Sequence, residues 1–225
     1  MKKIFLLSGS YILKEIPNDI AQIIHQSLTN NNLVVFIASN FASHESNDRH
    51  FANIVKWFED KDIIFKNNIL LDSRIQKEKM PKYIKQADMV FICGGDVLIQ
   101  MKNIRKYGLI KPLRKRKNII VGMSAGAINM AKKVVLAKDV EDNIPQMSIY
   151  QGIGLTNINI EPHIDLANKT HIREVLEASN HGEIILLDHE SSVIQENDAI
   201  THFGKYYIAK KGDFIYPKDF GKEVL

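Results

Sequence analysis

The stretch from Asn118 to Lys133, NIIVGMSAGAINMAKK, places a serine between two glycines at the end of an apolar, β-branched segment. The residues after Gly122-x-Ser124-x-Gly126 are typical of a helix. A strand that turns abruptly into a helix presents one side chain at the carboxyl edge of an α/β sheet, where ligands bind. Small residues also occur where a helix packs closely on a strand. The crowded turn nevertheless favours Ser124 as a nucleophile on an elbow.

A serine hydroxyl needs a base, and His163 is the best candidate among eight histidines. It lies in NIEPHID, at the end of an alternating segment, where the edge of a strand can present it to the same crevice. The acids that could orient it are Asp139, Asp165, Asp188 and Glu190. Spacing does not choose among them, because triad members meet in space and not along the chain.

The stretch FICGGD provides a second polar feature at the end of an apolar segment. Gly94 or Gly95 lets a backbone N–H approach a ligand closely, and the N–H of Ala125 lies at the elbow itself. These groups are candidates for an oxyanion hole. Asp96 is placed to cap the helix that follows, and it is also a candidate substrate-binding residue.

Short apolar runs alternate with stretches of helical period, which predicts an α/β fold with a largely parallel sheet. Five helices are expected. The first begins near Pro17, the second covers residues 47–60, the third runs from Leu98 to Arg105, the fourth is short, and the fifth covers about residues 168–180. Beyond Ala131 the pattern favours strands and turns. The expected strands of the sheet cover residues 3–8, 33–39, 67–72, 87–95 and 118–123.

Composition limits the class of protein. The 225 residues are 45% hydrophobic and 25% charged, which suits one domain spanning residues 1–225. The net charge of +4 and the single basic cluster from Lys111 to Lys117 do not indicate nucleic-acid binding. One cysteine, Cys93, excludes an internal disulfide. The five-residue apolar run at the start is too short for a signal peptide, and no run spans a bilayer, so we expect a cytoplasmic protein.

Residues 91–130 resemble the dipeptidase E, or aspartyl dipeptidase, family of serine peptidases, which is related to cyanophycinase. The resemblance rests on Gly-Gly followed by an acid or amide, a helix, and then a strand into G-x-S-A-G-A. It implies a doubly wound, flavodoxin-like sheet, as in class I glutamine amidotransferases, with extra C-terminal strands. It also implies that Ser124 is the nucleophile and His163 the base. An aspartate fifteen residues after the family's serine is implicated in activity, and the resemblance brings that catalytic role onto Asp139. The triad acid corresponds to Glu190, with Asp188 close behind.

The resemblance further implies hydrolysis of a small peptide by acyl transfer to water, with no cofactor and no metal, in a monomer or homodimer. Family members that prefer an N-terminal aspartate carry an arginine-containing helix after the histidine. Here only Arg173 offers that side chain, as a candidate substrate-binding residue. Asp96 replaces the usual asparagine, so the identity of the preferred peptide is open.

Three other interpretations remain. The first is another serine hydrolase, either an esterase or a cyanophycinase-like isopeptidase. The second is a metal-binding or non-catalytic protein, in which Glu161, His163 and Asp165 alternate along a strand and share one face. The third is a cysteine enzyme that uses Cys93, although that residue fits a small buried hydrophobe better.

Overall fold

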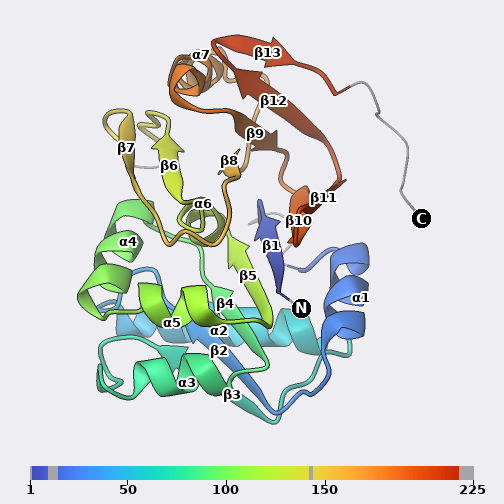
Figure 1. The fold of residues 1–225 in the computed structure, drawn as a ribbon, viewed down its shortest axis with the longest axis vertical. Helices are drawn as coiled ribbons and strands as arrows, with labels where there is room; N and C mark the ends of the chain where they lie inside the picture. Colours follow the sequence, from blue (N-terminus) through green and yellow to red (C-terminus); the bar gives the residue numbers. More distant parts are fainter. Residues whose placement is uncertain (1, 10–14, 142–143, 218–225) are drawn as a thin grey trace.

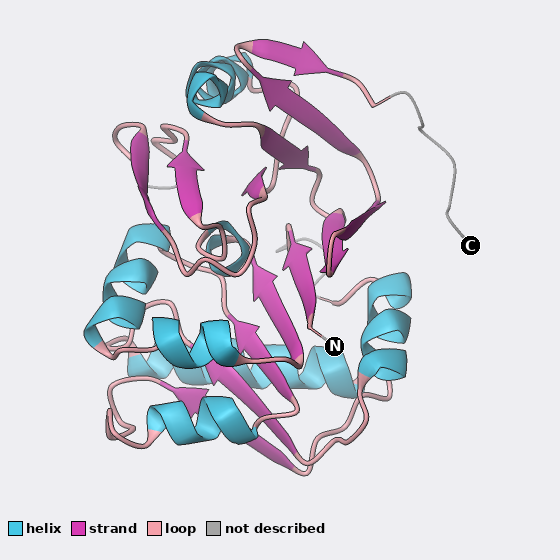
Figure 2. Ribbon diagram, viewed as in Figure 1, coloured by secondary structure: helices cyan, strands magenta, loops and turns pink. Residues whose placement is uncertain are grey.

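A seven-stranded sheet forms the centre of the computed structural model, which describes residues 2–9, 15–141 and 144–217 (Figures 1 and 2). Its order is β11-β10-β1-β5-β4-β2-β3. The five strands from β1 to β3 in this order run parallel, whereas β10 is antiparallel to β1 and β11 to β10. The bounds are β1 (Lys3–Leu7), β2 (Leu33–Ile37), β3 (Asn67–Leu71), β4 (Met89–Ile92), β5 (Ile119–Met123), β10 (Ser192–Glu196) and β11 (Ala199–Phe203).

Helices cover both faces of this sheet, because its strands are apolar on both sides. Alternate residues of β1, β2, β4 and β5 belong to two separate clusters, one with α1 and α2 and the other with α3, α4 and α5. Figure 1 shows α2 behind the sheet and α3 and α5 in front of it. The bounds are α1 (Asn18–Ser27), α2 (His44–Glu59), α3 (Met80–Gln86), α4 (Val97–Lys106), α5 (Ile110–Lys115) and α6 (Ala125–Ile128).

A second layer lies beyond the carboxyl ends of β1 and β5 (Figure 1). It contains a four-stranded sheet of order β13-β12-β9-β8 and the two-stranded sheet β6-β7. The helix α7 packs on it through Val175 and Ala178, which are fully buried with Ile184 and Ala209. The bounds are β6 (Lys133–Leu136), β7 (Ser148–Gln151), β8 (Asn159–Glu161), α7 (Lys169–Ala178), η1 (Ser179–His181), β9 (Ile184–Leu187), β12 (Tyr206–Lys210) and β13 (Asp213–Ile215).

The α/β class and the five expected parallel strands are confirmed, each within three residues at either end. Two elements were missed, α3 and β7. The helix α3 has seven residues, fewer than the window from which helical period is measured. The C-terminal strands do not simply extend one sheet, since they divide between the central sheet and the second layer. Among the residues that the structure describes, no helix is long and apolar enough to span a bilayer.

Candidate active site

Ser124 occupies the sharp turn between β5 and α6, with φ 50° and ψ −118°. A positive φ is strained for a residue other than glycine and persists only when the surroundings impose it. Here the Ser124 N–H donates to the Leu7 carbonyl at 2.9 Å, and the Ser124 carbonyl accepts from Ala127 at 2.8 Å and Ile128 at 3.0 Å. The turn is therefore held by β1 on one side and by the first turn of α6 on the other.

The two glycines of the elbow allow α6 to lie directly against the sheet. A Cβ on Gly126 would stand 2.1 Å from the Ile92 carbonyl oxygen, and one on Gly122 would stand 2.8 Å from the Ala127 nitrogen. Neither neighbour can yield, since both are backbone atoms. Close packing of the helix on the strand and a strained serine thus occur together. The two interpretations of Gly122-x-Ser124-x-Gly126, as a nucleophile elbow and as a close packing contact, do not exclude each other.

The imidazole of His163 lies beside this serine. Its Nε2 lies 3.1 Å from the Ser124 Oγ. The residue follows β8 and has φ 57°, so the chain turns sharply between the strand and the imidazole. Its backbone N–H donates to the Oγ of Ser8 at 2.9 Å, and the N–H of Ile164 donates to the Leu187 carbonyl at 3.0 Å. These bonds attach the histidine loop to the ends of β1 and β9.

The surroundings of His163 favour its neutral form. Burial, and to a smaller extent the neighbouring imidazole of His189, lowers the pKa of His163 to about 4. The centroids of the two rings are 5.4 Å apart. Because a base must be unprotonated to accept a proton, His163 is in the competent form throughout the neutral range.

A cavity of about 630 Å³ opens beside the serine. Five of the predicted site residues line it together, namely Ser124, His163, Gly94, Gly95 and Asp96. A Cβ added to Gly94 would lie 3.4 Å from the Ser124 Cβ, so this backbone is adjacent to the reacting atom. Gly95 has φ 126°, a conformation that glycine adopts readily. Ala125 is buried as the first residue of α6, where helix amides have no intrahelical acceptor.

Asp96 serves the structure and also faces the cavity. Its Oδ1 accepts the Ile99 N–H at 2.8 Å and caps α4, as the sequence predicted. Its carbonyl oxygen accepts from the Ser39 hydroxyl at 2.9 Å. Both interpretations of Asp96 are therefore compatible with its position.

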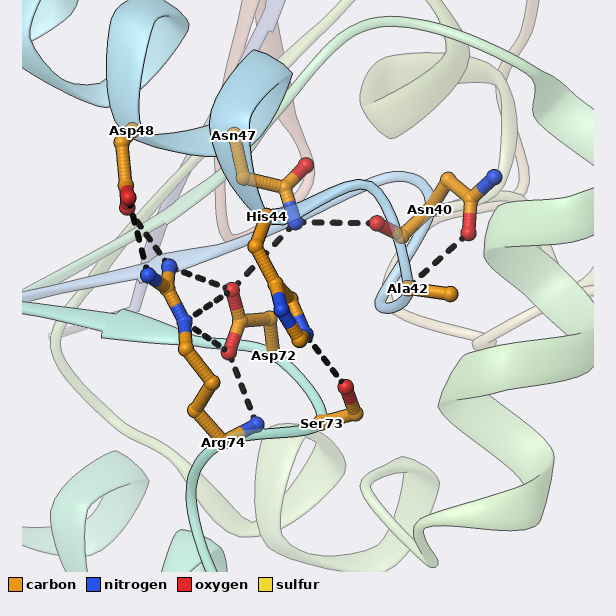
Figure 3. Close-up of polar contacts among 8 residues, drawn as sticks. All are labelled: Asn40, Ala42, His44, Asn47, Asp48, Asp72, Ser73 and Arg74. Carbon is orange, nitrogen blue, oxygen red and sulfur yellow. Dashed lines mark hydrogen bonds and ion pairs between the residues drawn. The ribbon is translucent and has the colours of Figure 1, made fainter.

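A polar network at the start of α2 and the end of β3 borders the cavity (Figure 3). Asn40 and Asn47 line the cavity, and the Asn47 side-chain amide donates to the Asn40 carbonyl at 2.9 Å and to Asp72 at 3.3 Å. Asp72 is 1% exposed, and the guanidinium of Arg74 joins it to Asp48. A buried carboxylate at the end of β3 thus fixes the side-chain amide of Asn47, which lines the cavity.

Two of the predicted residues lie elsewhere. Arg173 is exposed on α7, where its Nε donates to the Lys169 carbonyl at 3.3 Å. Asp139 lies beyond β6 and is paired with His171. Neither residue is among those that line the cavity in the described part of the chain.

The candidate acids occupy the turn between β9 and β10. Asp188 accepts the His189 N–H at 2.6 Å, so one of its oxygens stabilises the turn itself. Glu190 is exposed and lines a small cavity with His189. This small cavity shares Gly9 and other wall residues with the large one, so the acid lies in the neighbourhood of the base.

Two residues that contact the base were missed from the sequence. Ser8 is fully buried and holds the His163 backbone, yet in the sequence it is one small polar residue at the end of a strand. His189 follows an acid in a turn, and its spacing from His163 carries no periodic signal. Only the meeting of β1, β8 and β9 brings these residues together.

Two of the alternative interpretations change with the structure. The strand β8 ends at Glu161, and the positive φ of His163 breaks the alternation that would have aligned Glu161, His163 and Asp165 on one face. The metal set proposed from that alternation is therefore wrong. Burial raises the pKa of the Cys93 thiol to about 12, which keeps it protonated, as expected for a small buried hydrophobe.

Comparison with known families identifies the chain. The model of peptidase family S51 matches residues 4–203, which include the elbow, His163 and the turn with Glu190. The chain belongs to peptidase family S51. This is a family of serine peptidases, so the S51 assignment confirms the prediction of a serine-type peptidase of the dipeptidase E kind.

Solved structures share the fold of this S51 chain. A peptidase from an acI-B1 Actinobacterium superposes with a TM-score of 0.69 at 13% identity, covering 97% of this chain and 96% of the other. A protein from Listeria monocytogenes EGD-e, described as a candidate peptidase E, gives 0.66 at 16% identity, covering 90% and 98%. No curated protein matches the chain.

The environment of His163 predicts the pH dependence of catalysis. Since the pKa of His163 is about 4, kcat/KM should stay level as the pH falls through 6.5 and decline only as it approaches 4. In His189→Asn the pH at which kcat/KM declines should rise, because the imidazole that lowers the pKa of His163 electrostatically is removed. It should stay below 6.5, because the burial of His163 is unchanged. The measurement is kcat/KM between about pH 3.5 and 8 on protein shown to be folded by circular dichroism. The control is His25→Asn on exposed α1, and an acid limb near 6.5 in wild type would contradict the prediction.

Proposed function

We propose that Ser124 and His163 hydrolyse a small peptide through an acyl-enzyme. The proposal is carried by one observation, the 3.1 Å separation of His163 Nε2 from the Oγ of a serine on a strained elbow. The imidazole accepts the hydroxyl proton as the oxygen attacks the peptide carbonyl. It then donates the proton to the leaving amine. In the second half of the reaction, His163 accepts a proton from water as the water attacks the acyl-enzyme, and the proton returns to the Ser124 oxygen as the acyl group leaves.

The developing oxyanion needs donors on the other side of the carbonyl. We assign this role to the N–H of Ala125 with that of Gly94 or Gly95. The assignment is supported by the position of Ala125 at the start of α6 and by the closeness of Gly94 to Ser124. Removal of one such donor costs other hydrolases roughly 3 to 4 kcal/mol of barrier.

Glu190 is proposed as the residue that positions the imidazole. It lies in the same turn as His189, beside the cavity that contains the base. Asp188 is the weaker choice, because its carboxylate already accepts the N–H of the turn. The catalytic role of Asp139 stays a prediction, since that residue lies in a different cluster.

The cavity supports a small polar substrate. Its volume of about 630 Å³ is in the range of pockets for drug-sized ligands, which suits a short peptide. Neutral amides from Asn40, Asn47 and Asn53 line it and can bind backbone groups of the substrate. We propose that the Asp96 carboxylate binds the α-amino group. Binding of an aspartyl side chain of the substrate by Arg173 is not supported, because Arg173 is exposed on α7 and is not among the described residues that line the cavity.

Compartment and assembly are further proposals. The single cysteine is buried, which suits a reducing environment, and we propose a cytoplasmic protein. We also propose that it acts as a monomer or homodimer on a peptide substrate, without nucleic acid or membrane.

Loss of the nucleophile should abolish peptide hydrolysis. Ser124→Ala should reduce kcat/KM at least about a thousandfold, because the remaining donors can only bind the carbonyl. The measurement is hydrolysis of a panel of dipeptides, aspartyl anilides, β-linked isopeptides and acyl esters by purified wild type and variant. Ser148→Ala, on β7 and not among the described residues that line the cavity, is the matched control. Equal activity of Ser124→Ala and wild type would contradict the proposal, and isopeptide-only cleavage would favour the cyanophycinase-like alternative.

The choice of acid can be tested by two conservative variants. If Glu190 positions His163, Glu190→Gln should lower kcat about a hundredfold or more with little change in KM. Asp188→Asn keeps an acceptor for the His189 N–H and should lower kcat less than about tenfold. The reverse order would assign the role to Asp188. Equal and small effects would mean that neither acid completes a triad.

The proposed amine-binding role of Asp96 can be tested separately from its role as the cap of α4. Asparagine caps helices about as well as aspartate, so Asp96→Asn should leave the free energy of unfolding within about 0.5 kcal/mol. It should raise KM for peptides with a free amino group by up to about fivefold and leave N-acetylated substrates unaffected, because only the charge of an exposed carboxylate is lost. Steady-state kinetics on matched free and acetylated peptides provides the measurement. An equal effect on both would exclude an ion pair with the amine.

A further inference from the structure

A buried cluster of an imidazole and two carboxylates lies apart from the serine. It contains Asp139 beyond β6, Glu161 at the end of β8, and His171 in the first turn of α7. One ligand atom from each lies within 4.8 Å of the other two. Their side chains are 15%, 8% and 10% exposed, in that order. None of the three is among the described residues that line the cavity beside Ser124.

The distances within this cluster are longer than direct charge-assisted hydrogen bonds. The His171 Nε2 is 3.3 Å from Glu161 Oε1 and 3.6 Å from Asp139 Oδ2. Charge-assisted N–H···O bonds are about 2.7 to 2.9 Å long. A single ring nitrogen carries at most one N–H, so it cannot donate a full hydrogen bond to two carboxylates. Both oxygens nevertheless converge on that one atom.

The same distances match the edges of a metal coordination sphere. Zinc binds imidazole nitrogen and carboxylate oxygen at about 2.0 to 2.2 Å, and a tetrahedron of that size has edges of about 3.4 Å. We propose that Asp139, Glu161 and His171 bind a transition-metal ion of the Zn²⁺ type. Imidazole suits this class better than Mg²⁺ or Ca²⁺, which prefer oxygen alone. Three protein ligands leave the fourth position to water.

The surroundings of each ligand suit such a site. Asp139 Oδ1 accepts the Glu141 N–H at 2.9 Å, which orients the carboxylate with Oδ2 toward the imidazole. The His171 N–H donates to Asn168 Oδ1 at 3.0 Å, so the capped start of α7 fixes the residue that carries the ring. Orientation of ligands by such outer hydrogen bonds is typical of metal sites.

The ion would join three separate segments of the second layer. Glu161 precedes Pro162 and His163, so the site lies two residues before the base. Metal bound there stabilises the junction of β8, α7 and the segment after β6 and takes no part in the attack on the peptide bond. The inference does not rest on the peptidase proposal, because binding is measured without substrate.

Titration with zinc tests the site. The full chain is freed of metal with a chelator, the chelator is removed, and ZnCl₂ binding is followed by calorimetry, with MgCl₂ and CaCl₂ in parallel. We expect one high-affinity Zn²⁺ per chain, a higher Tm with Zn²⁺, and far weaker binding of the other two ions. Glu161→Gln and His171→Ala should each weaken Zn²⁺ binding at least about tenfold. Each variant is first shown to be folded by circular dichroism in the absence of metal.

Two matched variants and one spectrum make the outcome decisive. Glu174→Gln on the same helix and His25→Ala on exposed α1 should keep wild-type affinity. X-ray absorption of the zinc-loaded wild type should show nitrogen and oxygen ligands at about 2.0 to 2.2 Å and no sulfur. The proposal is overturned if wild type binds no Zn²⁺, if the cluster and control variants bind equally, or if sulfur from Cys93 appears among the ligands.

Discussion

The structure of the candidate site depends on one close contact, the direct approach of α6 to the backbone of β4. Gly126 allows it, since any larger residue would collide with the Ile92 carbonyl. The contact fixes the start of α6, and the pairing of Ser124 with Leu7 fixes the end of β5. Between two such constraints the serine has no relaxed conformation available, and its φ of 50° follows. The packing of its neighbours therefore sets the conformation of Ser124, the proposed nucleophile.

His163 reaches Ser124 from a different layer of the molecule. Ser124 belongs to the central sheet, whereas His163 follows β8 of the second sheet. The buried hydroxyl of Ser8 connects the two, because it extends from the end of β1 to the backbone of His163. The burial that makes this connection rigid also disfavours the imidazolium. A carboxylate that stabilises the imidazolium of His163 in the transition state would therefore lower the barrier, and that is the role proposed for Glu190.

The end of β8 and the two residues after it contact two separate side-chain clusters. The strand β8 ends at Glu161, which contacts His171, and His163 two residues later contacts Ser124. The left-handed conformation of His163 separates the two side chains, since strict alternation would have placed them on one face. The contact of His163 with Ser124 and the Asp–Glu–His cluster thus share a backbone segment.

The sequence alone determined the parts of this protein that depend on neighbours along the chain. Apolar runs predicted the parallel strands, the glycine spacing predicted the elbow, and Asp96 predicted the cap of α4, because strand burial, turn sterics and helix capping are local effects. Tertiary structure alone decided what surrounds the imidazole. Ser8 and His189 contact His163 across long sequence separations, and Asp139 pairs with His171 on another element. Such contacts form when one layer packs on another, and neither the hydrophobic period nor the spacing of residues along the chain predicts them.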